Sequence, residues 1–288
     1  VAKITANITD SLKIETEMAQ NNFDANRFSS LNGEESIRGA SKFSLNFHSK
    51  EIKHVGKILL NTNGKIITSD FIAPDRVNDV EYSRKWNLYN SRNREELLFE
   101  GIAKYIPYDF LFLDIDYGSL HHENFRSTRN KESVTFFQEN FPKLFYAIEN
   151  IERKQTFSND ADTSSSWQRQ KGKAEWKIQS FLPSLRFEKE EKKENVLLNS
   201  SFRFNEFAPK LSLQKIYGTE FSTEIEIRNE DSILTRSFIR ASNTLTQKYS
   251  FNIYEINNFS STVDATFRNK KFTSSFLTKG NRNTSTNL

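Results

Sequence analysis

The chain has 288 residues, of which 36% are hydrophobic and 13% are aromatic, including 26 Phe. So many aromatic residues exclude a disordered chain, and the low hydrophobic fraction predicts apolar residues spread over many strands rather than a thick core. A net charge of only +4 argues against a nucleic-acid-binding protein, and the absence of Cys excludes disulfides and thiol chemistry.

Apolar and polar residues alternate with a period of two in the first half of the chain. The alternation runs through residues 12–18, 42–48 and 111–117, and it predicts half-apolar strands. The last segment places four apolar residues on one side: Leu111, Leu113, Ile115 and Tyr117. We expect these four to face lipid or an apolar core, and Asp114 and Asp116 to face water. Only residues 94–105 offer a candidate helix, and they fit neither period.

The second half of the chain repeats the alternation. It is clearest in residues 221–228, 248–253 and 263–268, where Phe, Ile, Val and Tyr alternate with charged or polar residues. No apolar run approaches the roughly 18 residues that a membrane-spanning helix requires.

The expected connections alternate in length. Short turns are predicted near residues 9–11, 49–50, 107–109, 140–142, 183–184, 208–209 and 229–231. Longer polar stretches are predicted as loops at residues 21–36, 70–94, 121–131 and 155–166. Short turns at one end and long loops at the other are typical of transmembrane barrels.

A faint internal repeat agrees with this interpretation. The segment that begins at Pro142 is echoed at Pro183, an offset of 41 residues, and more briefly at Pro209. Such an offset fits one hairpin of long strands. Propeller blades have a similar period, but their sequence motifs are missing here.

These patterns predict an all-β chain built as an antiparallel up-and-down meander of about 14 to 16 strands. The fold class is a transmembrane β-barrel or a large fragment of one. Residues 1–288 are expected to form a single domain of this kind, either complete or part of a longer chain.

Two groups of residues are predicted as sites; both are interpreted as structural, and ligand binding is the alternative for the first. The first is a loop cluster of charged and aromatic residues: Asp75, Arg76, Asp79, Glu81, Tyr82, Arg84 and Trp86. We expect its arginines to pair with its acids and Trp86 to be at least half buried. The second is a charged strand face that points to water or into a barrel lumen, where it gives an anion-leaning wall: Arg169, Lys171, Lys173, Glu175 and Lys177.

The segment 75–88 resembles a recurrent loop of large, uncharacterised barrel-like proteins of Bacteroidota and related bacteria. In that group an Asp-Arg pair is followed by an acidic-aromatic step and then by Arg-x-Trp, as in Arg84 to Trp86. The later segment 116–120 and the two Pro-x-Leu strand starts are also similar to that group. The resemblance covers residues 12–190, implies an outer-membrane β-rich protein, and carries no ligand or reaction.

Other candidate chemistry has a simpler structural explanation. His121 and His122 lack a carboxylate or Cys at metal-ligand spacing, and His48 and His54 are isolated. Asp114 and Asp116 share a strand face and resemble an acid/base pair, but a polar strand face explains them. We therefore expect no metal, no cofactor and no enzymatic activity.

Two functional classes fit this sequence. The first is an integral protein of the bacterial outer membrane with a porin-like, export or surface-scaffold role. Its expected partners are outer-membrane lipid and other envelope proteins, with no nucleic acid. The alternative is a secreted soluble β-sandwich or extended-sheet module for binding or adhesion, whose inner faces would meet as a core.

Overall fold

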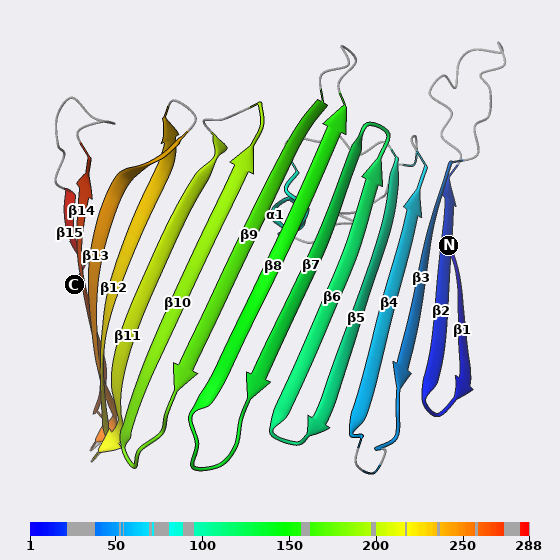
Figure 1. The fold of residues 1–288 in the computed structure, drawn as a ribbon. Coiled ribbons are helices and arrows are strands. Elements are labelled where there is room, and N and C mark those ends of the chain that lie inside the picture. The colour runs from blue at the N-terminus through cyan, green and yellow to red at the C-terminus, as the bar shows by residue number, and fades with distance from the viewer. Residues whose placement is uncertain are drawn as a thin grey trace. The chain divides into compact units, whose positions relative to one another are not determined.

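The computed structural model describes residues 1–21, 38–51, 53, 55–68, 71, 81–88, 95–156, 162–196, 200–216, 218–234, 237–256, 259–273 and 283–287. Strands take up 82% of these residues. Fifteen strands form one antiparallel meander in which each strand pairs with the next along the chain (Figure 1). The expected all-β meander of about 14 to 16 strands is therefore confirmed.

The first six strands are β1 (Ala2–Thr9), β2 (Leu12–Asn21), β3 (Arg38–His48), β4 (Lys57–Ile67), β5 (Glu96–Tyr108) and β6 (Leu111–His122). They are followed by β7 (Phe125–Phe136), β8 (Lys143–Thr156), β9 (Asp162–Glu175), β10 (Phe181–Glu194) and β11 (Phe202–Ile216). The last four are β12 (Thr219–Leu234), β13 (Ser237–Ile256), β14 (Phe259–Phe272) and β15 (Asn283–Asn287). One short helix, α1 (Tyr82–Lys85), lies between β4 and β5 in the described part of the chain.

The chain divides into two compact units. Unit 1 comprises Val1–Glu132 and Asn150–Ser165, and unit 2 comprises Ser133–Glu149 and Ser166–Leu288. Strands β7, β8 and β9 contribute residues to both units. Each unit is described by itself below.

The strands of unit 1 have one apolar face. A single row across β1 to β5 pairs Ile4 with Thr16, Thr16 with Phe43, Phe43 with Gly64, and Gly64 with Phe99. Residues two positions away along each strand share this side, because successive side chains of a strand alternate between faces. Its exposed apolar side chains include Ile4, Met18, Phe43, Ile66, Leu97, Phe99, Ile115 and Tyr117. This set is the apolar face of unit 1.

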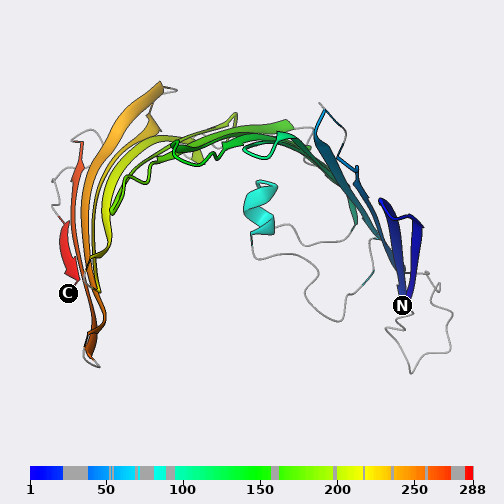
Figure 2. The same cartoon turned by 90° about the horizontal axis from the view of Figure 1, so that it is seen from below.

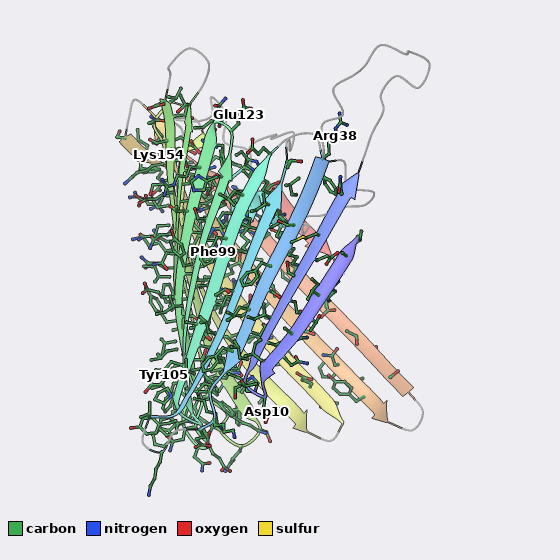
Figure 3. All side chains as sticks on the ribbon, turned by 90° about the vertical axis from the view of Figure 1, so that its right-hand side faces the viewer. Asp10, Arg38, Phe99, Tyr105, Glu123 and Lys154 are labelled. Carbon is green, nitrogen blue, oxygen red and sulfur yellow. The ribbon has the colours of Figure 1, made fainter. Side chains whose placement is uncertain are left out.

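Figure 3 follows these strands from end to end. Asp10 and Tyr105 lie toward one end, Arg38 and Glu123 toward the other, and Phe99 lies between. The expected alternation in β6 is confirmed, because Ile115 and Tyr117 pair with Ala103 and Gly101 on the apolar face. Asp114 and Asp116 lie on the opposite face.

The strands of unit 2 also have an apolar face. One row joins Phe187, Phe207, Ile227 and Leu245 on β10 to β13. A second row joins Phe181, Leu213, Phe221, Phe251 and Val263 on β10 to β14. Most of these large apolar side chains are exposed to at least a third of their surface. The rows and the positions between them form the apolar face of unit 2.

Three of the expected turns are wrong, because residues 183–184, 208–209 and 229–231 all lie inside long strands. Pro209 shows why. The pairing with β10 continues through Pro209, but the pairing with β12 skips from Phe207–Ile227 to Lys210–Glu224. The proline lacks only the N–H that would point to β12, so one gap in one ladder accommodates it. Proline here does not mark a strand start.

Two further expectations need correction. Most of the candidate helix at residues 94–105 is strand instead, because residues 96–105 belong to β5, in which Glu96 and Leu98 are buried while Leu97 and Phe99 are exposed. Residues 121–131, expected as a long loop, contain only a tight turn between β6 and β7. Most residues of the long connections expected at 21–36 and 70–94 lie outside the described residues, so these two expectations stay predictions. The 41-residue offset spans the β8–β9 hairpin.

Candidate functional site

A segment of the chain lies against the polar face of unit 1. This inserted segment comprises residues 81–88, which are α1 and the residues beside it, and Figure 2 shows α1 on one side of the strands. Its two aromatic side chains, Tyr82 and Trp86, belong to the largest apolar cluster of the described residues, together with Leu98 and Leu120. Leu98 and Leu120 pair in register on β5 and β6. The segment therefore packs on the side opposite the apolar face.

Trp86 is the anchor of the inserted segment, since none of its surface is exposed. It lies over Gly118 of β6 so closely that a Cβ atom there would be 2.5 Å from Trp86 Cη2. Only a residue without a side chain leaves room for the indole at this point. The ring of Tyr82 lies 6.4 Å from that of Trp86, tilted by 59°. Trp86 thus packs directly on Gly118, which we call the seat of this anchor residue.

Two ion pairs flank the aromatic cluster. Lys65 of β4 contacts the buried carboxylate of Glu96 at 2.5 Å, and its ammonium group lies 5.2 Å from the centre of the Tyr82 ring. Lys85 pairs with Glu100 and lies 5.8 Å from the Trp86 ring. Burial, with the neighbouring carboxylates of Glu96 and Glu100, raises the pKa of Tyr82 above its ordinary value. Tyr82 therefore stays a neutral phenol.

Asn87 ends the helix and ties it to more distant strands. Its φ of 53° is left-handed, a conformation that Asn tolerates better than most residues and that often terminates a helix. Its side-chain amide donates to Ser165 Oγ at 2.9 Å, and its carbonyl accepts from Arg153 Nη1 at 3.4 Å. Asn87, Ser165 and Arg153 are all buried. Helix, turn and strands are thus fixed to one another within unit 1.

One expectation for the predicted loop cluster, the burial of Trp86, is confirmed. Trp86 is fully buried, as expected, and Tyr82 is buried beside it. Glu81 and Arg84 are exposed, and the Glu81 carbonyl accepts the N–H of Lys85 at 2.8 Å. Asp75, Arg76 and Asp79 lie outside the described residues, so the expected pairing of these acids and arginines stays a prediction.

The sequence analysis did not identify the residues that hold the segment: Lys65, Glu96, Gly118, Leu120, Arg153 and Ser165. One signal was present. Two of the segments that carried the resemblance were 75–88 and 116–120, and the structure brings residues 81–88 of the first onto the second, because Trp86 packs on Gly118 and Leu120. The two motifs form one packing site.

The polar face of unit 2 is organised by ion pairs between strands. Glu206, which is 7% exposed, receives Arg186 at 2.6 Å and Arg228 at 3.4 Å. Lys248 lies 3.0 Å from both Glu224 and Glu226. Opposite charges alternate across β10 to β13, so each carboxylate has a cation on a neighbouring strand. We call this set the ion-pair network of unit 2.

The predicted charged face of β9 also lies in unit 2. Arg169 is buried, contacts Glu149 at 2.9 Å, and lies 3.7 Å from the centre of the Trp167 ring. Lys171 pairs with Glu188 at 2.9 Å, and Lys173 with Glu175 at 2.6 Å. These glutamates neutralise basic side chains whose positive charge had predicted a lumen wall that prefers anions. Strand β9 begins at Asp162, so residues 162–166, expected as part of a long loop, belong to the strand. It ends at Glu175, so Lys177 follows it.

The other candidate residues form no visible reaction centre. Asp116 accepts from the buried Arg129 at 2.8 Å instead of simply facing water. His122 Nδ1 contacts the carbonyl of Glu95. Among the residues that the structure describes, no three His, Asp or Glu side chains gather as a metal site, and no helix is long and apolar enough to cross a membrane.

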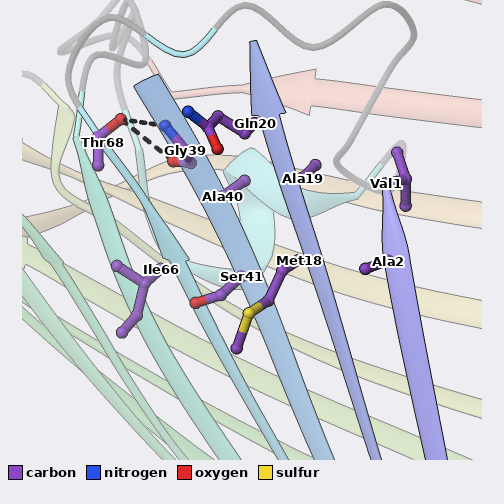
Figure 4. Close-up of a pocket in the computed structure, with 10 residues that line it drawn as sticks. All are labelled: Val1, Ala2, Met18, Ala19, Gln20, Gly39, Ala40, Ser41, Ile66 and Thr68. Atoms are coloured by element: carbon purple, nitrogen blue, oxygen red, sulfur yellow. Dashed lines mark hydrogen bonds between the residues drawn. The ribbon is translucent and has the colours of Figure 1, made fainter. Parts of the chain in front are cut away.

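A hollow lies near one end of β1 to β4 (Figure 4). Small side chains on adjacent strands, such as Ala19, Gly39 and Ala40, leave this space open. Thr68 Oγ1 exchanges hydrogen bonds with the backbone of Gly39 at 3.0 and 3.1 Å. No charged side chain lines the hollow, so it offers little for recognising a polar ligand.

Comparison of the sequence with known protein families and with curated proteins gives no match. A proposal for the function therefore depends on the fold and on the side chains of the two faces in each unit.

Proposed function

We propose that this chain is an integral outer-membrane β-barrel protein, or the barrel portion of one, with a porin-like, export or surface-scaffold role. The observation that carries the proposal is the distribution of side chains between the two faces in each unit. Large apolar residues such as Phe99, Ile115, Phe207 and Phe251 are exposed, with Ile115 at 55%. Glu96, Glu206 and other charged residues are buried on the opposite face.

This distribution is the reverse of that in a water-soluble protein. Soluble proteins bury apolar side chains and rarely expose apolar patches beyond a few hundred Å². Among the described residues, buried polar and charged side chains outnumber buried apolar ones. A sheet with apolar side chains toward lipid and polar side chains toward an aqueous interior would account for both faces.

Strand length and pairing also support a membrane location. A tilted strand needs about 9–11 residues to cross the hydrocarbon layer, and every strand from β2 to β14 has at least ten. Antiparallel pairing of each strand with the next satisfies the backbone hydrogen bonds, which lipid requires. Within the proposed interior, the inserted segment fills part of the polar face of unit 1. This favours an export or scaffold role over a wide, open pore.

The proposal is tested by spin labels at neighbouring positions on opposite faces. Because the chain has no Cys, single cysteines can be introduced at Met18 and Glu17 in β2, and at Phe267 and Thr266 in β14. We expect labels at Met18 and Phe267 to be accessible to oxygen, which concentrates in lipid, after reconstitution into vesicles. Labels at Glu17 and Thr266 should be accessible to a water-soluble nickel chelate instead.

A chain that stays soluble without detergent would support the secreted module instead. If the nickel chelate then reaches the labels at Met18 and Phe267, the module is an extended sheet whose apolar faces are in water. If both labels are shielded from the nickel chelate in solution, the module is a sandwich whose apolar faces meet as a core.

A further inference from the structure

The apolar face of unit 2 ends abruptly at one row of residues. Beyond the row of Phe187, Phe207, Ile227 and Leu245, the next row toward the β10–β11 and β12–β13 connections is entirely polar. The register joins Lys189 to Asn205, Asn205 to Asn229, Asn229 to Asn243, and Asn243 to Lys271. We call these five residues the asparagine row. Asn205, Asn243 and Lys271 are exposed, and the row spans about 19 Å at the usual strand spacing.

Two arginines and one aspartate stand in the row after it. Arg203 donates to Asp231 Oδ2 from Nε at 2.9 Å and from Nη2 at 2.7 Å, while Arg240 Nε donates to Asp231 Oδ1 at 2.6 Å. Asp231 is only 4% exposed, whereas the side chains of Arg203 and Arg240 are 35% and 41% exposed. One carboxylate neutralises one guanidinium group, so this trio keeps a net positive charge at the surface.

A β-bulge places Arg240 on this face. Glu230 pairs with Ser242 but Asp231 pairs with Arg240, so Ala241 is an extra residue in β13. Below the bulge the even-numbered residues of β13, such as Thr244, are buried on the polar face. Without the extra residue Arg240 would share that face. Bulges commonly redirect a side chain toward a functional position, and here the bulge brings a second arginine to Asp231.

The two rows together are strongly basic. They contain four bases and only two acids: Lys189, Arg203, Arg240 and Lys271 against Glu191 and Asp231. Glu191 is also paired with a further base, Lys193, at 2.6 Å. Asn243 Oδ1 accepts from Arg240 Nη1 at 2.9 Å, which leaves its NH2 group to donate to a ligand. The patch thus combines an excess of cations with exposed amide donors.

The corresponding position in unit 1 has a different character. On β2, β3 and β4 the residues that follow the apolar face are Gln20, Gly39 and Thr68, which carry no charge. The basic patch is therefore a specific feature of unit 2 rather than a general way of ending an apolar face.

We propose that this patch binds the phosphate groups of an anionic lipid headgroup. The inference rests on the proposed function, since it requires the apolar face of unit 2 to lie in lipid. Guanidinium groups and amides suit phosphate oxygens, and basic side chains near an anionic headgroup attract it electrostatically. The acyl chains of the same molecule would lie on Phe207, Ile227 and Leu245 in the adjacent row. This adjacency favours a lipid over a free anion or a protein partner.

The test uses the whole 288-residue chain folded in an uncharged detergent. It is titrated with short-chain phosphatidic acid, short-chain phosphatidylcholine and inorganic phosphate, and binding is measured by thermophoresis. We expect saturable binding of phosphatidic acid that weakens with salt. The double variant Lys189→Gln, Lys271→Gln should lower this affinity about thirtyfold, because two cations are lost and no buried charge is left unpaired.

Two matched variants complete the design. Lys171→Gln with Lys173→Gln removes the same charge from the polar face and should leave the affinity unchanged. Arg203→Gln, Asp231→Asn, Arg240→Gln neutralises the trio without leaving an unpaired charge, and it should also weaken binding. The proposal is overturned if both patch variants bind like the parent chain, if the polar-face control loses as much affinity, or if inorganic phosphate competes as well as the lipid.

Failure of the proposed function would be recognised separately. A spin label at Phe267 in the same sample reports whether the apolar face is in the detergent's apolar phase. If the label is in that phase but phosphatidic acid does not bind, only the headgroup site is wrong. If the label is in water, the membrane location itself is wrong.

Discussion

The polar faces of the two units are occupied in different ways. In unit 1 a piece of the chain itself, the inserted segment 81–88, packs its Trp86 and Tyr82 on β5 and β6. In unit 2 the corresponding side chains satisfy one another directly, as in the contacts of Glu206 with Arg186 and Arg228. Ion pairs also flank the cluster in unit 1, but a buried aromatic anchor occurs there, whereas the described polar face of unit 2 is organised by charge.

This difference has physical consequences. Close packing of an indole ring is lost when the ring or its seat changes shape, and salt hardly affects it. Ion pairs between partly exposed strands are screened by salt, and removing one partner leaves the other charge without compensation. The two units should therefore respond to different perturbations, and variants in each can separate the two mechanisms.

The largest effect is expected for Trp86→Ala. Removing a fully buried Trp leaves a cavity over Gly118 and should cost about 3–5 kcal/mol of the contacts that hold the segment. We expect rapid protease cleavage near Lys85, with strand content by circular dichroism nearly unchanged. Trp176→Ala is the control, because Trp176 is 45% exposed. Equal cleavage of both variants would argue against the anchor.

A smaller effect is expected when the seat is altered instead of the anchor. Gly118→Ala places a methyl group 2.5 Å from Trp86 Cη2, so the ring must shift, at a cost of about 1–3 kcal/mol. The change should shift the Trp86 fluorescence spectrum in a chain whose other two Trp are replaced by Phe. Gly64→Ala is the matched control, since the nearest atom to its new Cβ would be 3.8 Å away. An unchanged spectrum in Gly118→Ala would show that Trp86 does not rest on Gly118.

In unit 2 the matching perturbation is Glu206→Gln. It removes one carboxylate from Arg186 and Arg228, but Arg186 keeps Glu224 at 3.6 Å and Arg228 keeps Glu230 at 2.8 Å. Their side chains are also 41% and 32% exposed, so the loss should be only about 1 kcal/mol. The free energy of unfolding in urea should fall for the parent chain as salt rises, and it should depend less on salt in the variant. Arg186→Met with Glu206→Met should recover most of the stability. A variant with the same salt dependence as the parent would show that the network contributes little.

The alternation of residues was enough to predict the meander. Period-two patterning is local, and it separates Ile115 and Tyr117 from Asp114 and Asp116 whatever the partners are. The turns inside β10 to β12 were mispredicted because Pro183, Pro209 and residues 229–231 are local turn formers, and pairing with long neighbouring strands outweighs that preference. Residues 94–105 fit neither period, so the strand at residues 96–105 becomes clear only from its pairing with β4 and β6.

The site was only half predictable. The aromatic residues and charges of segment 75–88 indicated an ordered loop and a buried Trp86, and the structure confirms that burial. The seat was not predictable, because Gly118 meets Trp86 only once β5 and β6 pair and the segment folds back on them. Glu96 and Ser165 likewise gain their roles from contacts between residues distant in sequence.

The smallest effect is expected for Arg84→Ala, although the sequence singled out Arg84 as strongly as Trp86. Arg84 is exposed on α1, and the contacts of an exposed charge contribute about 0–1 kcal/mol because water and ions screen them. We therefore expect protease cleavage near Lys85 to rise only slightly in Arg84→Ala, and the difference from the parent chain to shrink as salt rises. Trp86→Ala measured in parallel sets the scale for full release of the segment. If Arg84→Ala releases the segment as completely as Trp86→Ala does, charge rather than packing holds it, and the contrast between the two units disappears.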